Sequence, residues 1–441
     1  MHNGTIHTTA TQHRGQSSVS AARHQNNRPR VLRSDKLPLN YELLFLQTIC
    51  LLGVINAHYM CIESYIHNIF NYYTWLIAFF IFLSGLLFAQ KALKRKLFPY
   101  FWHKCKTLLL PALFVNLCYG IISNVLRRYG FIEYGTTLSL RSLFISPFLN
   151  NDQFGCNLAQ YYIFQLFLIE ILANCLYRIP IIFTKKPMLS DSIVLAVSFA
   201  LSYYCFSICR KPDYKTPEYT LLLRTGYLFF YFVLGVFYER YIRVFLEKWR
   251  TPVIGCFLAI FTQVLVMTLT NWPETVIFMP EMNAAKIQHD FVPYFTFLTA
   301  AVFMLCLART LSPVLEQSKT LRFIGPNLRY VFYHHQFTVF FIGLIIFIIW
   351  LSGDRGEMIA RFNPISFRRH PWYCFPLTTN DYAKVPYMIA AFFGPVMIGK
   401  YINKCSKTWV RVLLWILLMI LILAFITFFG RKYQDVIRNI N

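Results

Sequence analysis

The sequence predicts an all-α, polytopic transmembrane helical bundle of about 10 to 11 spans. Hydrophobic residues make up 56% of the 441 residues and charged residues only 14%, and the mean hydropathy is +0.46. A soluble domain carries about 25% charged residues, so this composition excludes a soluble protein. Continuous apolar stretches approach the ~20 residues that a helix needs to cross a bilayer, whereas a membrane β-barrel would show alternating segments of about ten residues.

A polar, basic segment precedes the first apolar stretch. Residues 1–37 contain Arg14, Arg23 and Arg28 among several His, Gln and Asn residues. No apolar core follows closely enough for a cleaved signal peptide, so we expect a disordered basic cytoplasmic tail. Residues 38–402 are predicted to form the membrane domain, and residues 403–441 an additional C-terminal transmembrane helix and tail.

Eleven apolar stretches follow the tail in order. As candidate spans we take 41–62, 72–92, 107–126, 158–177, 192–208, 221–241, 253–270, 292–308, 331–351, 385–402 and 410–429. The loops that should then lie inside are strongly basic, as cytoplasmic loops are, and the predicted outer loop 272–291 is mildly acidic. One predicted outer loop, 352–384, carries four arginines. Either it is a structured outer loop or a span is miscounted near it. An odd number of spans places the C-terminus outside.

The net charge of +24 follows from these basic loops, so we expect no nucleic-acid partner. The 12 cysteines form no CxxC pair of the kind that binds metal, and no metal is expected.

His58 is the most informative residue, because it lies inside the first apolar stretch. An ionisable side chain at membrane depth costs about 2.5–3.5 kcal/mol, so it commonly faces a cavity and has a function. Histidine also exchanges protons near neutral pH. His58 comes 17 residues into its span, roughly 25 Å along the helix and toward the outer side. The competing interpretation is a core histidine bonded to a neighbouring helix.

Two further features could carry chemistry. His334 and His335 open the ninth span on its inner half, either as an interfacial pair or with one ring facing a central cavity. A basic cluster before the third span could bind phosphate, although cytoplasmic loops are basic for topological reasons alone. Its members are Lys91, Lys94, Arg95, Lys96, His103, Lys104 and Lys106.

Three other residues have structural interpretations. Glu170 and Arg224 are charged residues within spans, and a structural ion pair inside the bundle is the simplest role for them. Gly85, after Ser84, favours close approach of two helices rather than a nucleophilic serine.

These elements occur in an order that resembles the acyltransferase-3 family of integral-membrane acyltransferases, which includes polysaccharide O-acetyltransferases. The resemblance runs from about residue 39 to residue 400. The motifs are GVINAH at 53–58, FFIFLSGLLF at 79–88, KTLLLP at 106–111, FYFVLG at 230–235 and the run from Gly325 to His335. Each motif is mostly apolar, and the specificity lies in five of them in order.

The chain departs from the family pattern at several positions. Gln47 stands where the family has a basic residue eleven positions before the histidine, and Leu44 stands in place of an aspartate. The paired basic residues before the third helix become His103, Lys104 and Lys106. These departures change the basic residues that are expected to bind the acyl donor of the family.

The resemblance implies a membrane-embedded O-acyltransferase. Acyl-CoA, most simply acetyl-CoA, would dock from the cytoplasm on Arg95, His103, Lys104 and Lys106. His58 would act as general base or carry the acyl group, and His335 would orient or assist. The acceptor would be a hydroxyl of a surface or secreted glycan on the outer side of a bacterial inner membrane.

Two other classes compete with this interpretation. A multi-pass transporter or flippase for glycan or lipid precursors would also use intramembrane charges around a cavity. Such proteins often show paired halves with broken helices, and this sequence shows no such symmetry. A sensor or assembly partner without turnover is the third class.

Overall fold

The structure is a computed structural model that divides into two units, Met1–Asn40 and Tyr41–Asn441. It describes residues 40–59, 69–70, 72–91, 96–149, 154–156, 161–179, 186–209, 216–248, 251–270, 290–353, 357–370, 373–375 and 384–440. The predicted tail, 1–37, lies outside these ranges. The described helices all belong to the second unit.

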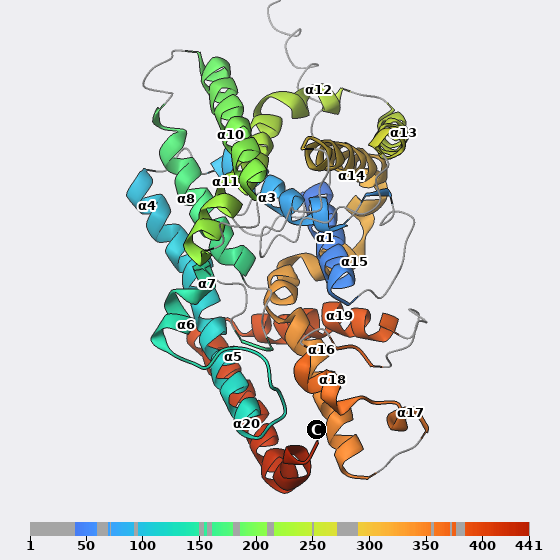
Figure 1. Ribbon diagram of the computed structural model, residues 1–441. Coiled ribbons are helices and arrows are strands. Elements are labelled where there is room, and N and C mark those ends of the chain that lie inside the picture. The colour runs from blue at the N-terminus through green and yellow to red at the C-terminus, as the bar shows by residue number, and fades with distance from the viewer. Residues whose placement is uncertain are drawn as a thin grey trace, which may run out of the picture. The chain divides into compact units, whose positions relative to one another are not determined.

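The regular elements in the described ranges are helices (Figure 1). In chain order they are α1 (Tyr41–Tyr59), α3 (Tyr72–Lys91), α4 (Leu97–Lys104), η1 (Cys105–Leu109), α5 (Leu110–Arg128), α6 (Leu140–Phe144), α7 (Ser146–Leu149), α8 (Tyr161–Leu176), α10 (Pro187–Cys209), α11 (Pro217–Phe237), η2 (Tyr238–Ile242), α12 (Arg243–Glu247), α13 (Pro252–Thr270), α14 (Val292–Gln317), α15 (Lys319–Ile324), η3 (Gly325–Asn327), α16 (Leu328–Leu351), α17 (Glu357–Ala360), α18 (Pro364–Arg369), α19 (Val385–Lys404) and α20 (Thr408–Arg438).

Membrane-crossing helices account for most of these elements. Within the described ranges, nine helices are long and apolar enough to cross a bilayer, and two shorter apolar helices, Trp75–Ala89 and Tyr162–Leu176, lie in α3 and α8. Each coincides with one of the predicted apolar stretches. The prediction of an all-α, polytopic transmembrane bundle is confirmed.

Helix α11 lies at the centre of the bundle, and its side chains from Tyr227 to Val233 are all buried. Its closest neighbour is α3, at a crossing of two glycines. A Cβ on Gly85 would overlap the carbonyl oxygen of Phe232, and a Cβ on Gly235 would overlap that of Phe82. The two backbones therefore touch, as small residues allow in membrane bundles. The prediction that Gly85 serves helix packing is confirmed.

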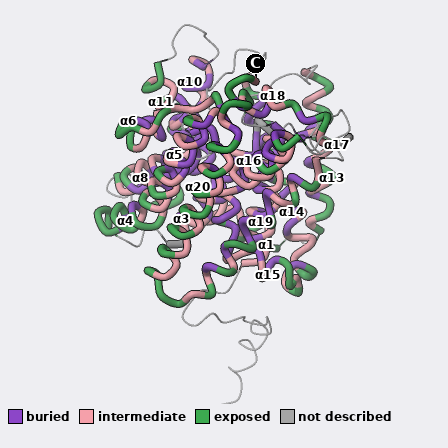
Figure 2. The backbone as a smooth tube through the Cα atoms, turned by 90° about the horizontal axis from the view of Figure 1, so that it is seen from below, coloured by how far each residue is buried: buried purple, intermediate pink, exposed green. Residues whose placement is uncertain are grey.

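The helices at the periphery of the bundle have many exposed side chains, unlike the buried α11. Figure 2 shows exposed residues gathered on outlying helices such as α4 and α13. Along residues 412–428 of α20 the exposed side chains are apolar, among them Leu417, Leu421 and Phe428. An α20 of 31 residues is roughly 46 Å long, more than the ~30 Å hydrocarbon core, and its apolar surface suits contact with lipid tails.

Two predicted helix starts are wrong. The third span does not begin at 107, because a continuous helical stretch, Leu97–Arg128, includes part of the basic cluster. A π-helical turn, η1, accommodates the sequence just before Pro111, where a proline would otherwise break the α-helical bonding pattern. The ninth span begins near Lys319 rather than at 331, since helical structure continues through Gly325 and Pro326.

Polar contacts join segments that were predicted to share a membrane side. On the predicted outer side, Arg368 forms an ion pair with Glu133 (2.7 Å) and donates hydrogen bonds to the carbonyls of Gly130 and Ile440. The loop 352–384 thus meets both the α5–α6 connection and the end of α20. These contacts explain two of the four arginines in that loop, because Arg369 also pairs with Glu133. They favour a structured outer loop over a miscounted span.

A second set of contacts joins the predicted inner ends. Glu42 at the start of α1 pairs with Arg309 near the end of α14 (3.2 Å), and Arg322 lies over the ring of Tyr41. Tyr330 at the start of α16 donates to Asn403 at the end of α19. Both groupings agree with the predicted alternation of the spans.

Candidate functional site

His58 and His335 meet inside the bundle. Their ring centroids are 5.7 Å apart and the ring planes differ by 16°, which is a stacked arrangement. His58 lies near the end of α1 and is half-buried, and His335 lies in α16 with only 3% of its surface exposed. Two histidines that are far apart in sequence thus form one pair of proton-exchanging groups.

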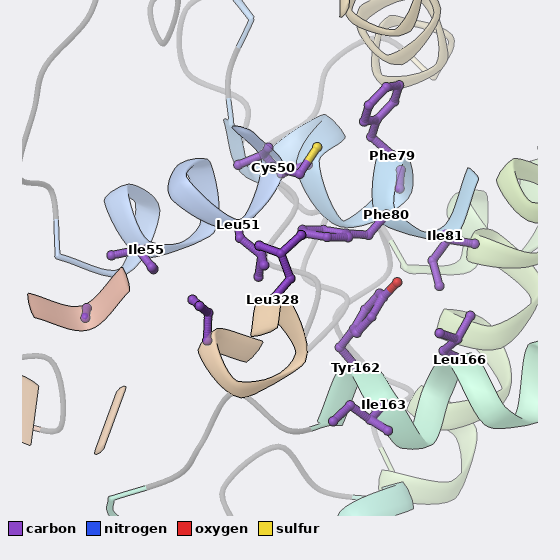
Figure 3. Close-up of a cluster of buried hydrophobic side chains, with 14 of the residues drawn as sticks. Cys50, Leu51, Ile55, Phe79, Phe80, Ile81, Tyr162, Ile163, Leu166 and Leu328 are labelled. Carbon is purple, nitrogen blue, oxygen red and sulfur yellow. The ribbon is translucent and has the colours of Figure 1, made fainter. Parts of the chain in front are cut away.

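A stacked pair lies at one depth, so the prediction of His58 on the outer side and His335 on the inner half is wrong as it stands. The error comes from where the ninth span was taken to start. Counted from Lys319, His335 is 16 residues, roughly 24 Å, along its helical stretch, and His58 is 17 residues, roughly 25 Å, along α1. Figure 3 shows Leu51 and Leu328 meeting between the same helices, each seven residues before the histidine.

The hydrogen bonding of His335 identifies which ring nitrogen is available for chemistry. Nδ1 of His335 lies 3.0 Å from the carbonyl oxygen of Val331. A carbonyl oxygen only accepts, so Nδ1 carries the proton and the neutral ring keeps a lone pair on Nε2. Nε2 is buried and has no hydrogen-bond partner among the described residues. An imidazole in this state can accept a proton from a substrate.

His334, the neighbour of His335, faces a different helix. Its Nδ1 lies 2.6 Å from the hydroxyl of Tyr119 on α5, and its ring packs against Trp415 of α20 at 4.7 Å. From the sequence alone, either His334 or His335 could face the interior of the bundle. The structure brings His335 to His58 and gives His334 a bonding role between α5, α16 and α20.

Cys156, whose thiol lies 3.7 Å from the backbone oxygen of Tyr119, is poorly suited as a nucleophile. Its thiol is within 3.0 Å of the Ser123 hydroxyl and is fully buried. Burial raises the pKa of Cys156 to about 12, because the thiolate would lose its hydration, and the hydrogen bond from Ser123 offsets this only in part. A reactive cysteine needs a stabilised thiolate, so acyl transfer through Cys156 is disfavoured.

Three of the four predicted donor-binding residues, His103, Lys104 and Lys106, lie in the described part of the chain. Lys104 pairs with Glu170 of α8 at 2.5 Å, and Glu170 also accepts a hydrogen bond from Tyr100. Lys106 is exposed over the ring of Trp102, and His103 is exposed as well. Arg95 lies outside the described residues.

The pairing of Lys104 limits what it can bind. Glu170 is 4% exposed, so moving Lys104 to a phosphate would leave a buried carboxylate without its cation. Breaking a buried pair in this way costs about 3–5 kcal/mol. The simplest role of Lys104 is to neutralise Glu170 and fix α4 on α8.

The expected ion pair between Glu170 and Arg224 does not form. Glu170 is taken by Lys104, and Arg224 on α11 donates to Gln165 (2.7 Å) and to the carbonyl of Phe148 (3.1 Å). The two charges lie on helices with several neighbours each, and sequence does not show which face of α8 meets α11.

A further cluster of charged residues, besides the basic cluster and the Glu170 and Arg224 sites, was not predicted from the sequence. The pairs Glu42–Arg309 and Glu239–Arg243 lie beside a small, partly enclosed pocket whose lining comes from α1, η2, α12, α13 and α14 at their predicted inner ends. All four residues lie at span ends that were predicted to share one side of the membrane. This shared side is the sequence signal that could have identified the group.

Comparison with known proteins decides the family. An acyltransferase-3 family model, described as an acyltransferase domain, matches residues 40–367, well over half of the chain. The chain belongs to the acyltransferase-3 family. A search of curated proteins and a search of solved structures found no match. Membership makes this chain a membrane acyltransferase, and the matched region contains α1, α16 and both stacked histidines. It disfavours the transporter and sensor interpretations.

Proposed function

We propose that this acyltransferase moves an acetyl group from cytoplasmic acetyl-CoA to a hydroxyl of a surface or secreted glycan. The enzyme would lie in a bacterial inner membrane with its N-terminus in the cytoplasm. The stacked pair of His58 and His335 carries the proposal, since it places a buried, unpaired imidazole nitrogen beside a second imidazole. Such a pair supplies general base catalysis, the main requirement for activating a hydroxyl.

The reaction would need one proton transferred and returned. An imidazole nitrogen accepts the proton of the acceptor hydroxyl as its oxygen attacks the thioester carbonyl. The carbon–sulfur bond then breaks, and the imidazolium returns the proton to the departing thiolate, giving an ester and free CoA. In the alternative path, His58 takes the acyl group first and passes it to the hydroxyl. His335, held by Val331, would act as the base or orient His58.

The test follows release of free CoA thiol by the purified protein with acetyl-CoA and an added glycan acceptor. His58→Ala and His335→Ala should each lower turnover by about 10²–10⁴-fold, the usual contribution of general acid–base catalysis. His334→Gln is the matched control, because His334 adjoins His335 but faces Tyr119.

Three outcomes are informative. Loss of turnover in both alanine variants with activity retained in His334→Gln supports the proposal. Full turnover in His58→Ala would refute the assignment of the histidine pair. Absence of both turnover and CoA binding in the wild-type protein would refute the donor, and other acyl thioesters would then be the substrates to test.

A further inference from the structure

The short connection between α19 and α20 carries a group of basic side chains, which we call the hairpin cluster. Its members are Lys404 in the last turn of α19, Lys407 just before α20 and Arg411 near the start of α20. The exposed Arg329 of α16 lies beside them, because its Nη2 donates to Oδ1 of Asn403 (3.3 Å). The family match ends at residue 367, so the three members of the hairpin cluster lie outside the acyltransferase domain.

The hairpin cluster is a local excess of positive charge. Residues 385–434 contain no aspartate or glutamate. Within the described part of the chain, none of the three members forms an ion pair with a carboxylate. Carboxylates at other predicted inner ends lie beside cations of their own, which are Arg309 for Glu42, Arg243 for Glu239 and Arg322 for Glu316.

Both lysines of the hairpin cluster lie over exposed aromatic rings. Nζ of Lys404 is 5.0 Å from the ring centroid of Tyr401, and Nζ of Lys407 is 6.0 Å from that of Trp409. Tyr and Trp side chains gather where the bilayer meets water, because their rings are apolar and each has one polar group. These pairs therefore indicate that the connection lies at the level of the lipid headgroups.

The length of α20 agrees with this level. Residues 412–430 carry no charge, and as a helix they are roughly 28 Å long, close to the ~30 Å thickness of the hydrocarbon core. Arg411 and Arg431 therefore lie near opposite headgroup levels. Lys400, one turn before Lys404 on α19, lies 4.7 Å from the ring centroid of Phe323 in α15. This contact joins the connection to the predicted inner ends.

The surface next to the hairpin cluster is apolar. Met397 and Ile398 on α19 are exposed, and so are Val412 and Leu413 on α20. A ligand that matches both features has an anionic group and hydrocarbon chains. Phospholipids with a net negative charge have this chemistry, and the bilayer brings them to this surface. A soluble anion would leave the apolar part of the surface unmatched.

We propose that the hairpin cluster binds the phosphate of an anionic phospholipid in the predicted inner leaflet. Each Lys or Arg near a membrane surface attracts anionic lipid, and basic sites beside transmembrane helices bind their headgroups. Arg411 is held across the connection, because its Nε donates to the carbonyl of Cys405 (2.7 Å). A guanidinium group matches phosphate oxygens with paired hydrogen bonds. The lipid is a bound ligand that takes no part in acyl transfer.

The general enrichment of basic residues at inner ends explains the sign of the charge but predicts no preference among lipids. The experiment therefore compares two lipids with the same short chains, phosphatidylglycerol and phosphatidylcholine, binding to the full chain in a neutral detergent. Wild-type protein should bind phosphatidylglycerol more tightly, because the choline group of the other lipid balances its phosphate. Lys404→Gln with Lys407→Gln should raise the Kd for phosphatidylglycerol about 30-fold, roughly 5-fold for each cation removed, and leave that for phosphatidylcholine unchanged.

A matched control removes two cations from the other end of the same helix. Arg431 and Lys432 are exposed, and Asp435 lies one turn further along α20. Arg431→Gln with Lys432→Gln should therefore keep the preference for phosphatidylglycerol. An equal loss in this variant would mean that the total charge of the protein, and not the hairpin cluster, attracts the lipid, and would overturn the proposal.

Two further measurements separate charge from damage and lipid from soluble anion. Lys404→Arg with Lys407→Arg keeps both charges and should keep the preference, whereas loss of the preference in this variant would refute a charge contact. Glycerol phosphate has the anion without the chains and should not displace phosphatidylglycerol at equal concentration. Displacement would assign the hairpin cluster to a soluble anion. Equal affinity of the wild-type protein for both lipids would also overturn the proposal. None of these outcomes depends on the proposed function, because no acyl transfer is measured.

Discussion

His58 and His335 stack their rings at 5.7 Å although they come from the first and ninth predicted spans. The same two helices, α1 and α16, also meet at Leu51 and Leu328, each seven residues before its histidine. Two contacts between α1 and α16 thus hold the imidazoles against each other.

The free nitrogen of His335 gives a prediction that separates catalysis from orientation. An asparagine at this position keeps a donor near Nδ1 for the carbonyl of Val331 but has no basic nitrogen at Nε2. We therefore expect both His335→Asn and His335→Gln to lower kcat for acyl transfer by about 10²–10⁴-fold, with little change in KM. Retention of most activity in His335→Asn alone would assign His335 an orienting role. Unfolding temperatures of both variants control for folding.

The ion pair of Lys104 and Glu170 gives a stability prediction. Lys104→Gln leaves Glu170 buried without its cation, so we expect destabilisation by about 3 kcal/mol. The double change Lys104→Gln with Glu170→Gln should recover most of this loss, since no charge is then stranded. Lys106→Gln, at an exposed position, should change stability by less than about 0.5 kcal/mol. Thermal or denaturant unfolding in detergent measures all three, and a Lys104→Gln variant as stable as the wild type would contradict the structural role.

The contact of Gly85 with α11 predicts an unusually severe effect of one methyl group. Gly85→Ala places a Cβ against the carbonyl oxygen of Phe232, and backbone cannot move aside as a side chain can. We expect a loss of about 3 kcal/mol or more in unfolding free energy, at the upper end of overpacking costs. Gly53→Ala is the control, because there the new methyl meets only the flexible side chain of Leu76. Similar unfolding temperatures for the two variants would refute the backbone contact.

The two ends of α20 predict an accessibility difference that fixes the topology. Cys405 is half-exposed just before α20, on the predicted cytoplasmic side. A cysteine introduced as Asn439→Cys, in a Cys405→Ser background, lies past the other end of the helix. A membrane-impermeant maleimide should label the first only after the inner face is opened and the second in intact cells. Labelling of both from one side would mean that α20 does not cross the bilayer.

The fold was predictable because few backbone structures are stable inside a lipid bilayer. A spanning segment must satisfy its backbone internally and present apolar side chains, so each span appears as a continuous apolar run. The role of Gly85 could be predicted for a related reason, since only a small residue allows two membrane helices to touch. The family motifs, taken in order, then led to the family that the comparison found.

The partners of the charged residues could not be predicted in the same way. A charge in a span must find a partner, but the sequence does not say on which helix. The pairing of Lys104 with Glu170 could not be predicted, because the sequence does not show that α4 packs on α8. The depth of His335 was misjudged because Gly325 and Pro326 resemble a break, whereas a 3-10 turn carries the helical path through them.

Arg368 and Arg369 offer a matched comparison of a buried and an exposed arginine on one carboxylate. The Arg368 side chain is 11% exposed and bonds to Glu133, Gly130 and Ile440, whereas that of Arg369 is 59% exposed and pairs with Glu133. Arg368→Gln frees the end of α20 and leaves two carbonyls without their donor. Hydrogen bonds to charged groups contribute about 1.5–3 kcal/mol, so we expect a loss of at least that size.

Arg369→Gln should cost at most about 1 kcal/mol, as is usual for an exposed pair. Unfolding free energies of the two variants provide the comparison, and protease sensitivity near residue 440 reports release of the α20 end. If Arg369→Gln destabilises the protein as much as Arg368→Gln, the hydrogen bond from Arg368 to the carbonyl of Ile440 contributes nothing to stability. The predicted outer loop would then be held mainly by Glu133.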